Sequence, residues 1–563
     1  MKLRILGAAG MVTGSMYELL DDELGAHFLI DCGKAQGSDA ALIENGFPFD
    51  PSEIQFVLLT HAHLDHCGRL PELVRSGFKG PVICTAPTAR LAKSLLLNAA
   101  DHQPGRPREY VERIRWKTEE VHVTRGWLTA REANLHGKQI FYAPFRSSHL
   151  LGSVGFALSW GPERSRNPVI VFGGDIGPKF EGNECDFLEG KGQLPPFFPD
   201  SPCYTLVLES TYGAREELPR SRSARLAELT SLLEQAAAES RIILIPAFAL
   251  GRLQQVLFDL QSIRMQNCAL QCVKVFSPKA GLGVDASMAY LDCLFEKAAA
   301  KNGELKPLYA NKDVFAQAGA DISTSSGEAQ AKRILAAAFG FATTEPVHAQ
   351  PIEACDIENL RSHAPCVLVA PSGMADYGLM RQAIACHATD ARTTVAFCGY
   401  QARGSPGSVL MQRANNGTLI QDVRIWNDGS DSLSLSNVQA EAVRIEGYSG
   451  HATAPQLLSI VFDDSVIARR GKLPNRVFLV HGDHANRFAL QSMLEKRADQ
   501  LGVATEIRLP RTSTTEWIDL DAPIPVPTVE EAALVLQSLA ASKPSAFRRI
   551  MADIRKLIPS QSP

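Results

Sequence analysis

The 563-residue sequence has no long hydrophobic run. A membrane-spanning helix needs about 20 consecutive apolar residues, and no stretch of this chain approaches that length. Its first residues, MKLRILGAAG, contain neither the apolar core nor the cleavage site of a signal peptide. We therefore expect a cytoplasmic protein that has no membrane partner.

Paired cysteines and excess positive charge are also missing. The 12 cysteines are scattered and form no C-x-x-C pair, which argues against a disulfide framework or a zinc ribbon. The formal net charge is −4, whereas nucleic-acid binders often carry an excess of lysine and arginine. Any binding of a nucleic acid must therefore depend on local patches or on metal ions.

Short apolar runs rich in valine and isoleucine recur along the chain and predict buried strands. They lie at residues 3–7, 28–33, 56–61, 169–175, 205–211, 242–248, 366–373, 393–400 and 477–483. Amphipathic stretches such as 225–240 and 251–263 predict helices between some of them. The predicted fold class is α/β, and the length indicates two or more domains.

Several of these runs end in an ionisable residue. These residues are Asp31, His61, Asp175, Glu209 and His481. In open α/β sheets, active sites form at the carboxyl ends of the strands. Any single strand can end at a polar turn for structural reasons alone, but five ends that supply only histidine and carboxylate are poorly explained by chance.

The stretch LLTHAHLDHCG places four metal-ligand side chains in one turn, namely His61, His63, Asp65 and His66. Imidazole and carboxylate are the usual Zn²⁺ ligands outside thiolate sites, and a catalytic zinc has three protein ligands. Four ligands exceed the need of one such ion, so we expect two metal ions and additional ligands from elsewhere in the chain. His149, Asp175 and His481 are candidates, although each one taken singly is a weak signal.

Taken together, these residues resemble the metal-ligand set of the metallo-β-lactamase superfamily in the same chain order. The resemblance implies that His61, His63 and His149 hold one Zn²⁺, that Asp65, His66 and His481 hold a second, and that Asp175 bridges the two. Asp65 and Asp175 thereby count among the catalytic residues. It also implies that Asp31 supports the cluster from behind, as partners that orient a ligand imidazole do.

Further motifs resemble the β-CASP branch of this superfamily, which processes nucleic acids. The motifs are VLESTYG at 207–213, PAFALGRLQQVL at 246–257, APSGM at 370–374, GYQARGSPG at 399–407 and EGYSGHATAP at 446–455. They are most similar to RNA-cleaving members, and His481 favours RNA over DNA because DNA-directed members usually lack a histidine there. The resemblance implies a metallo-β-lactamase αββα sandwich with an inserted α/β β-CASP domain.

We expect four segments in the chain. Residues 1–213 and 448–511 form the two parts of the metallo-β-lactamase domain, 214–447 form the β-CASP domain, and 512–563 form a Pro-rich linker and a helical tail.

The resemblance implies a zinc-dependent ribonuclease acting on single-stranded RNA in RNA processing or decay. His451 is the candidate general acid, and Glu209 would orient it. Ser372, Gly373 and Arg403 lie in polar turns that could bind RNA phosphates. Alternatives are a catalytically silent RNA-processing scaffold or a small ester or thioester hydrolase on the same fold. The sequence does not distinguish endonuclease cleavage from 5′–3′ exonuclease cleavage. It also leaves the oligomeric state open, and a homodimer is one of the alternatives.

Overall fold

The computed structural model describes most of the chain. The described residues are 1–37, 39, 46–102, 108–119, 131–135, 138–160, 168–180, 184–188, 204–299, 305–399, 401, 404–416, 423–426, 433–462 and 473–521. One compact unit spans Met1–Asp521. None of the described helices combines the length and apolarity that crossing a bilayer requires.

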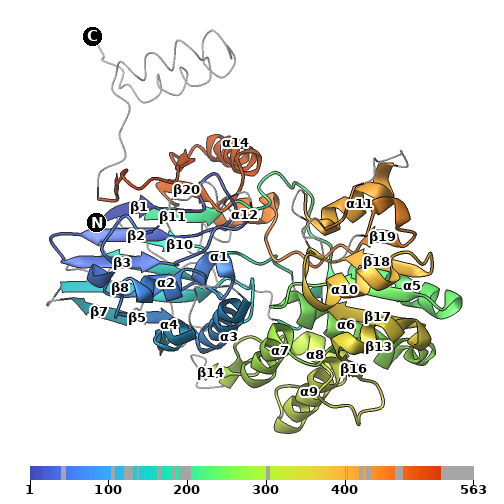
Figure 1. The fold of residues 1–563 in the computed structure, drawn as a ribbon. Coiled ribbons are helices and arrows are strands. Elements are labelled where there is room, and N and C mark those ends of the chain that lie inside the picture. Colours follow the sequence, from blue (N-terminus) through green and yellow to red (C-terminus); the bar gives the residue numbers. More distant parts are fainter. Residues whose placement is uncertain are drawn as a thin grey trace, which may run out of the picture. The chain divides into compact units, whose positions relative to one another are not determined.

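A first seven-stranded sheet contains most of the N-terminal strands (Figure 1). In spatial order its strands are β22 (Ile518–Asp519), β1 (Lys2–Ile5), β2 (Tyr17–Asp21), β3 (Ala26–Ile30), β4 (Val57–Leu58), β5 (Pro81–Cys84) and β6 (Arg115–Thr118). The pairs from β22 to β3 are antiparallel and those from β3 to β6 are parallel.

A second seven-stranded sheet faces the first. Its strands are, in order, β21 (Glu506–Arg508), β20 (Arg476–Val480), β11 (Tyr204–Glu209), β10 (Val169–Phe172), β9 (Val154–Trp160), β8 (Lys138–Arg146) and β7 (Arg131–Leu135). One buried apolar cluster joins side chains of both sheets, among them Phe28 and Leu58 of the first and Phe156 and Phe478 of the second. The two sheets are thus the inner layers of a sandwich, as predicted.

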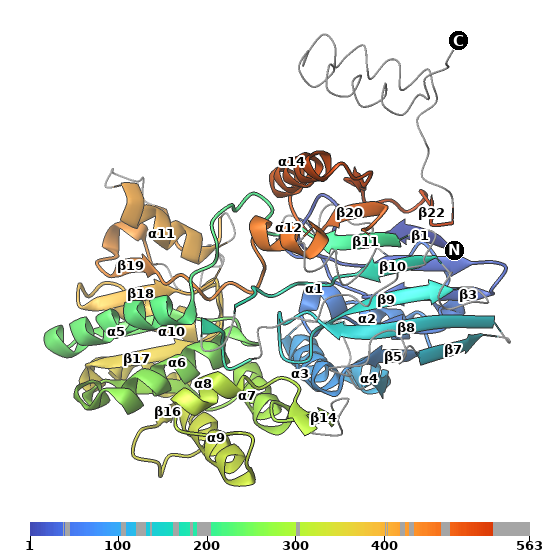
Figure 2. The same cartoon turned by 180° about the vertical axis from the view of Figure 1, so that it is seen from behind.

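Helices cover the outer faces of this sandwich (Figures 1 and 2). Those beside the first sheet are α1 (Leu64–Cys67), α2 (Leu70–Arg75), α3 (Ala86–His102) and α4 (Arg108–Glu112). Those beside the second are α12 (Ala454–Phe462) and α14 (His484–Leu501), whose apolar residues share a buried cluster with β11 and β20. This arrangement is the αββα sandwich of the predicted fold class.

A third, six-stranded sheet is entirely parallel. Its order is β16 (Ala349–Ile352), β13 (Lys274–Pro278), β17 (Cys366–Ala370), β12 (Ile242–Pro246), β18 (Thr393–Phe397) and β19 (Glu441–Arg444). Its helices are α5 (Arg222–Glu239), α6 (Arg252–Gln266), α7 (Leu282–Cys293), α8 (Lys312–Gln317), α9 (Ser325–Ala338), α10 (Gly378–His387) and α11 (Pro406–Asn416). A small hairpin, β14 (Lys297–Ala299) with β15 (Leu305–Pro307), follows α7.

The third sheet is inserted between two neighbouring strands of the second. β11 and β20 pair in parallel, yet all strands of the third sheet lie between them in the sequence. This connectivity supports our proposal that residues 214–447 form an inserted domain.

The C-terminal boundary of the sandwich differs from the expected one. β22 pairs with β1 although it follows residue 511, where we expected the domain to end. Two residues are too short a run for a sequence pattern to predict, and we extend the sandwich to Asp521, where the compact unit ends. The expected helical tail at 522–563 lies outside the described residues.

Candidate metal centre

The predicted ligand turn follows strand β4 and runs into helix α1. His61 is fully buried three residues after Leu58, and His63 is the residue directly before α1, which contains Asp65 and His66. Asp31, just after β3, holds this turn from behind: its carboxylate accepts from the Thr60 backbone N–H at 2.8 Å and from His66 Nδ1 at 2.7 Å. Asp31 adopts a left-handed φ of 58°, an unfavourable conformation for this residue that persists where surrounding contacts fix it.

The three remote candidates reach the same point from the second sheet and its loops. His149 Nε2 lies 3.1 Å from His63 Nδ1, and His481 Nε2 lies 3.2 Å from His66 Nε2. Asp175 follows β10 after Gly174, where an added Cβ would lie 3.1 Å from Thr60 Cβ. The backbone at this glycine therefore lies close to Thr60, which leaves little room for a side chain.

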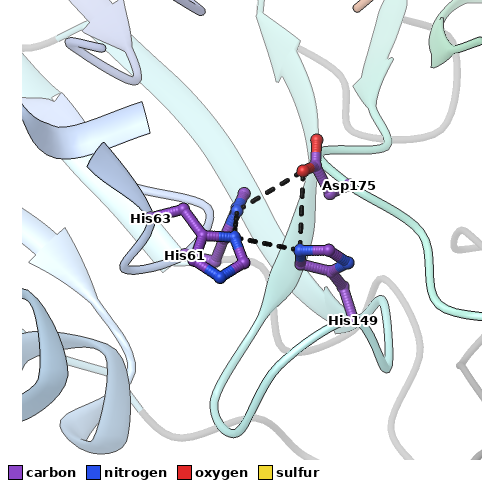
Figure 3. A group of neighbouring side chains, drawn as sticks. All are labelled: His61, His63, His149 and Asp175. Atoms are coloured by element: carbon purple, nitrogen blue, oxygen red, sulfur yellow. Dashed lines mark hydrogen bonds and ion pairs between the residues drawn. The ribbon is translucent and has the colours of Figure 1, made fainter. Parts of the chain in front are cut away.

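Asp175 lies between two groups of donors. Its Oδ2 is 3.5 Å from His61 Nε2 and 3.6 Å from His149 Nε2, as Figure 3 shows. Its Oδ1 is 3.2 Å from His66 Nε2 and 3.3 Å from His481 Nε2. The donors therefore form one group of His61, His63, His149 and Asp175 and a second of Asp65, His66 and His481, next to Asp175.

The second nitrogen of four of these rings is engaged by a partner outside the two groups. The contacts are His61 Nδ1 to Thr60 Oγ1 (3.1 Å), His66 Nδ1 to Asp31, His149 Nδ1 to the Gly450 carbonyl (2.5 Å) and His481 Nδ1 to Thr211 Oγ1 (3.0 Å). An imidazole that donates from one nitrogen presents a lone pair on the other. Ring nitrogens and carboxylate oxygens that converge at about 3 Å fit divalent metal ions, and histidine with carboxylate is a suitable ligand set.

The electrostatics of the centre agree with this fit. Burial lowers the pKa of His63 to about 4 and lowers the pKa values of His61 and His149 well below the usual range, so these rings are neutral, as metal binding requires. For His66, burial opposes protonation, but Asp175 and Asp31 raise its pKa well above the ordinary value. Negative charge that attracts a proton to His66 also attracts a divalent cation, which would displace that proton.

His451 stands beside the donor groups and is paired with Glu209. His451 Nδ1 donates to Glu209 Oε2 at 2.9 Å, and its Nε2 lies 3.9 Å from Asp175 Oδ2. Glu209 is buried at the end of β11 and also accepts from the Ile176 N–H at 2.7 Å. Burial disfavours the charged ring, but the Glu209 carboxylate outweighs it and raises the pKa of His451 to about 9. The imidazolium is therefore available as a proton donor at neutral pH.

Two of the three predicted phosphate-binding residues follow a strand of the third sheet. Ser372 and Gly373 follow β17: the Ser372 hydroxyl donates to Asp376, and the Gly373 carbonyl accepts from Gln401 Nε2 at 2.9 Å. Among the described residues, neither one is hydrogen-bonded or ion-paired to the donor groups. Arg403 lies outside the described residues.

Sequence reasoning named Asp31 but missed the other residues that contact the candidate ligand rings. Thr60 and Thr211 orient ligand imidazoles, and the Gly450 carbonyl orients His149. Thr60 directly precedes His61, and Thr211 lies two positions after Glu209, which was the only available signal. Gly450 is required because a Cβ there would lie 2.9 Å from His149 Cε1, a contact between residues 301 positions apart that no local pattern reveals.

The sandwich and its histidine- and aspartate-rich centre define a metal-binding protein of metallo-β-lactamase type. The family model of the metallo-beta-lactamase superfamily matches residues 13–157, and that of the Beta-Casp domain matches residues 228–410. The chain belongs to the β-CASP family within the metallo-β-lactamase superfamily, as the relatives below also show.

Three relatives indicate the range of this family. Ribonuclease TTHA0252 of Thermus thermophilus is 30% identical over 90% of this chain and 98% of its own length. Transcription termination factor FttA of Methanothermobacter thermautotrophicus is 27% identical over 83% of this chain and 65% of its own length. Cleavage and polyadenylation specificity factor 73 of Drosophila melanogaster is 24% identical over 96% of this chain and 67% of its own length.

Proposed function

We propose that this protein is a two-zinc ribonuclease that hydrolyses phosphodiester bonds of single-stranded RNA in RNA processing or decay. The observation that carries the proposal is the pair of donor groups on either side of Asp175, with the His451–Glu209 pair next to them. A relative that is 30% identical over nearly its whole length and bears the name ribonuclease supports the choice of reaction.

The ligands divide as the two groups suggest. His61, His63 and His149 would hold one Zn²⁺, Asp65, His66 and His481 the other, and Asp175 would contact both. When bound, the ions supply positive charge that offsets the phosphate and lower the pKa of an attacking water. Asp31, Thr60 and Thr211 keep the ligand rings in the orientation that binding requires.

His451 supplies the proton that the leaving oxygen needs. The proton leaves from Nε2, because Nδ1 is held by Glu209 at 2.9 Å. Glu209 keeps the ring in place and stabilises its charged form, since the carboxylate is itself buried and fixed by the Ile176 N–H. Protonation of the leaving group by a positioned histidine accelerates such reactions by about 10²- to 10⁴-fold.

The test is cleavage of a labelled single-stranded RNA by the purified protein, before and after chelation and after zinc is returned. We expect cleavage that chelation abolishes and zinc restores, with close to two zinc ions per chain by elemental analysis. His63→Ala should be inactive, whereas the matched control His348→Ala should cleave normally, because the His348 ring bonds to the nearby Glu345 carbonyl and belongs to neither donor group. Metal-replete protein that is inert on every RNA tried would contradict the proposal and favour a silent scaffold.

The mode of cleavage requires a second comparison. Products of one defined RNA carrying either a 5′-phosphate or a 5′-hydroxyl would distinguish internal cutting from stepwise removal of nucleotides from the 5′ end. Internal cutting predicts the same first products from both RNAs. A 5′–3′ exonuclease mode predicts mononucleotides and a rate that depends on the 5′ group.

A further inference from the structure

An arginine of the inserted domain lies next to the metal centre and has no assigned role. Arg252 is the first residue of α6, directly after Gly251, whose φ of 87° sharply turns the chain from β12 into the helix. It lines a pocket together with His149, Asp186, Gln255, Ser449 and Gly450. A cationic side chain thus shares a cavity with a candidate metal ligand.

The charge of Arg252 has no carboxylate partner among the described residues. Asp186, the acidic residue of the same pocket, is already engaged: its Oδ1 accepts from Arg225 Nη2 and its Oδ2 accepts from Gln255 Nε2 at 2.7 Å. Arg252 Nη1 donates instead to the neutral amide oxygen of Gln255. Within the described part of the chain, no carboxylate oxygen lies at ion-pair distance from Arg252.

Arg225 shows what a paired arginine looks like in the same region. Its Nε lies 2.7 Å from Asp259 Oδ2, its Nη2 contacts Asp186, and it is almost fully buried. Partly buried Arg252 has the same neighbourhood but only a neutral partner. A guanidinium that has lost water without gaining an anion can bind a ligand anion strongly.

Both Arg252 and His149 lie against Gly450. A Cβ added at Gly450 would lie 2.2 Å from Arg252 Nη2 and 2.9 Å from His149 Cε1. The guanidinium and the imidazole therefore lie against the same piece of backbone, whose carbonyl accepts from His149 Nδ1. A strand bound at the metal centre and extending into this pocket would meet the Arg252 N–H groups that have no partner among the described residues.

We propose that Arg252 binds a phosphate group of the RNA strand beside the metal centre, through charge-assisted hydrogen bonds from its guanidinium. The inference deepens the proposed ribonuclease function and rests on it. It assigns to the inserted domain a direct contact with substrate, and it makes Arg252 a substrate-binding residue. Arginine suits this role because its planar fork matches two phosphate oxygens, which the lysine ammonium cannot do.

The test compares Arg252→Met and Arg252→Lys with Arg333→Met. Arg333 is a matched control because it also donates to a glutamine three residues away, Gln330, but on an exposed helix surface. Each holoenzyme variant is first checked for zinc content and melting temperature. Binding of a fluorescent single-stranded RNA is then measured by anisotropy in a His451→Ala background, which slows cleavage, over a series of salt concentrations.

We expect Arg252→Met to weaken RNA binding by about 10- to 100-fold, the usual worth of charged hydrogen bonds. The slope of log affinity against log salt should decrease by about 0.7, the share of one phosphate contact on a single strand. Arg252→Lys should keep the salt slope and lose less affinity. Arg333→Met should match the parent protein in both measurements.

The outcomes separate the inference from the function on which it rests. In one outcome, the parent protein binds and cleaves RNA, and the folded, zinc-replete Arg252→Met variant binds RNA with unchanged affinity and salt slope. The inference is then wrong, and the ribonuclease proposal stands. Loss of zinc in Arg252→Met would likewise overturn it, by showing that Arg252 supports His149 instead. If Arg252→Met does not fold, Arg252→Lys decides: unchanged RNA affinity would contradict the phosphate contact. A zinc-replete parent protein that neither binds nor cleaves RNA would instead contradict the proposed function.

Discussion

Two sets of three adjacent parallel strands in this protein are followed by different kinds of residues, ionisable ones in one sheet and small ones in the other. In the second sheet, β10, β11 and β20 are neighbours, and the residues at or after their carboxyl ends include Asp175, Glu209 and His481. In the third sheet, β17, β12 and β18 are also neighbours, but Gly373 and Gly399 follow β17 and β18.

The residues after the third sheet's strands pack against one another instead of forming a polar centre. A Cβ at Gly373 or Gly399 would lie 2.9 Å or 2.8 Å from the ring of Phe248, which follows β12. Among the described residues, neither donor group contains a side chain from the third sheet. The same topology therefore builds a metal centre in one sheet and a closely packed edge in the other, and sequence at the strand ends makes the difference.

The largest loss of activity is expected when the sandwich loses the residue that lies between its two donor groups. Asp175→Asn removes the charge that lies between His61, His149, His66 and His481. Bound metal ions stabilise the transition state by several kcal/mol, so we expect the rate of RNA cleavage to fall by about 10⁴-fold when their binding is impaired. Elemental analysis should show fewer than two zinc ions per chain, and a variant with full zinc and near-normal activity would contradict the assignment.

The next largest effect tests whether proton donation is separate from metal binding. His451→Ala should slow RNA cleavage by about 10²- to 10³-fold while zinc content stays unchanged. A phosphodiester with a p-nitrophenolate leaving group needs no proton, so its hydrolysis should fall by about tenfold at most. Equal losses on both substrates would exclude His451 as the general acid.

A smaller effect is expected for Asp31, which contacts the His66 ring from the side away from the donor groups. Asp31→Asn keeps the shape of the side chain but weakens its acceptance from His66 Nδ1 and the Thr60 N–H. Zinc affinity should fall by about 10- to 100-fold, as for other partners that orient ligand imidazoles. Competition with a chelator measures this shift, and excess zinc should restore most of the cleavage activity.

The smallest effect is expected at the edge of the third sheet. Ser372→Ala removes a hydroxyl that donates to Asp376 and could donate to an RNA phosphate. One hydrogen bond contributes about 1 kcal/mol, so KM for RNA should rise by less than about tenfold while kcat and zinc content are unchanged. A large fall in kcat would show that the third sheet contributes to the chemical step, and the strand ends of the second and third sheets would then no longer differ in function.

The parts of the site that the sequence predicts are those with a local signal. His61, His63, Asp65 and His66 lie in one turn after an apolar run, so their spacing alone indicates a metal site. The distant residues required the family resemblance, because no local pattern pairs Glu209 with His451 across 242 positions. The apolar runs are long enough to indicate the α/β fold class, whereas the αββα sandwich also required the family resemblance.

Other features depend on contacts that only the folded chain creates. Arg252 looks like any helix-starting residue until Asp186 is seen to be occupied by Arg225 and Gln255. Gly450 is one of 42 glycines, and only its distance from His149 and Arg252 shows why a side chain does not fit there. β22 is two residues long, too short to carry a pattern, and it shifts the end of the sandwich beyond residue 511.

The central claim is that two metal ions share Asp175 within the sandwich. Anomalous scattering from crystals of the zinc-loaded protein, measured on both sides of the zinc absorption edge, tests it most directly. We predict two zinc peaks, one among His61, His63, His149 and Asp175, the other among Asp65, His66, His481 and Asp175. A fully loaded crystal with a single peak, or with peaks away from these residues, would contradict the account.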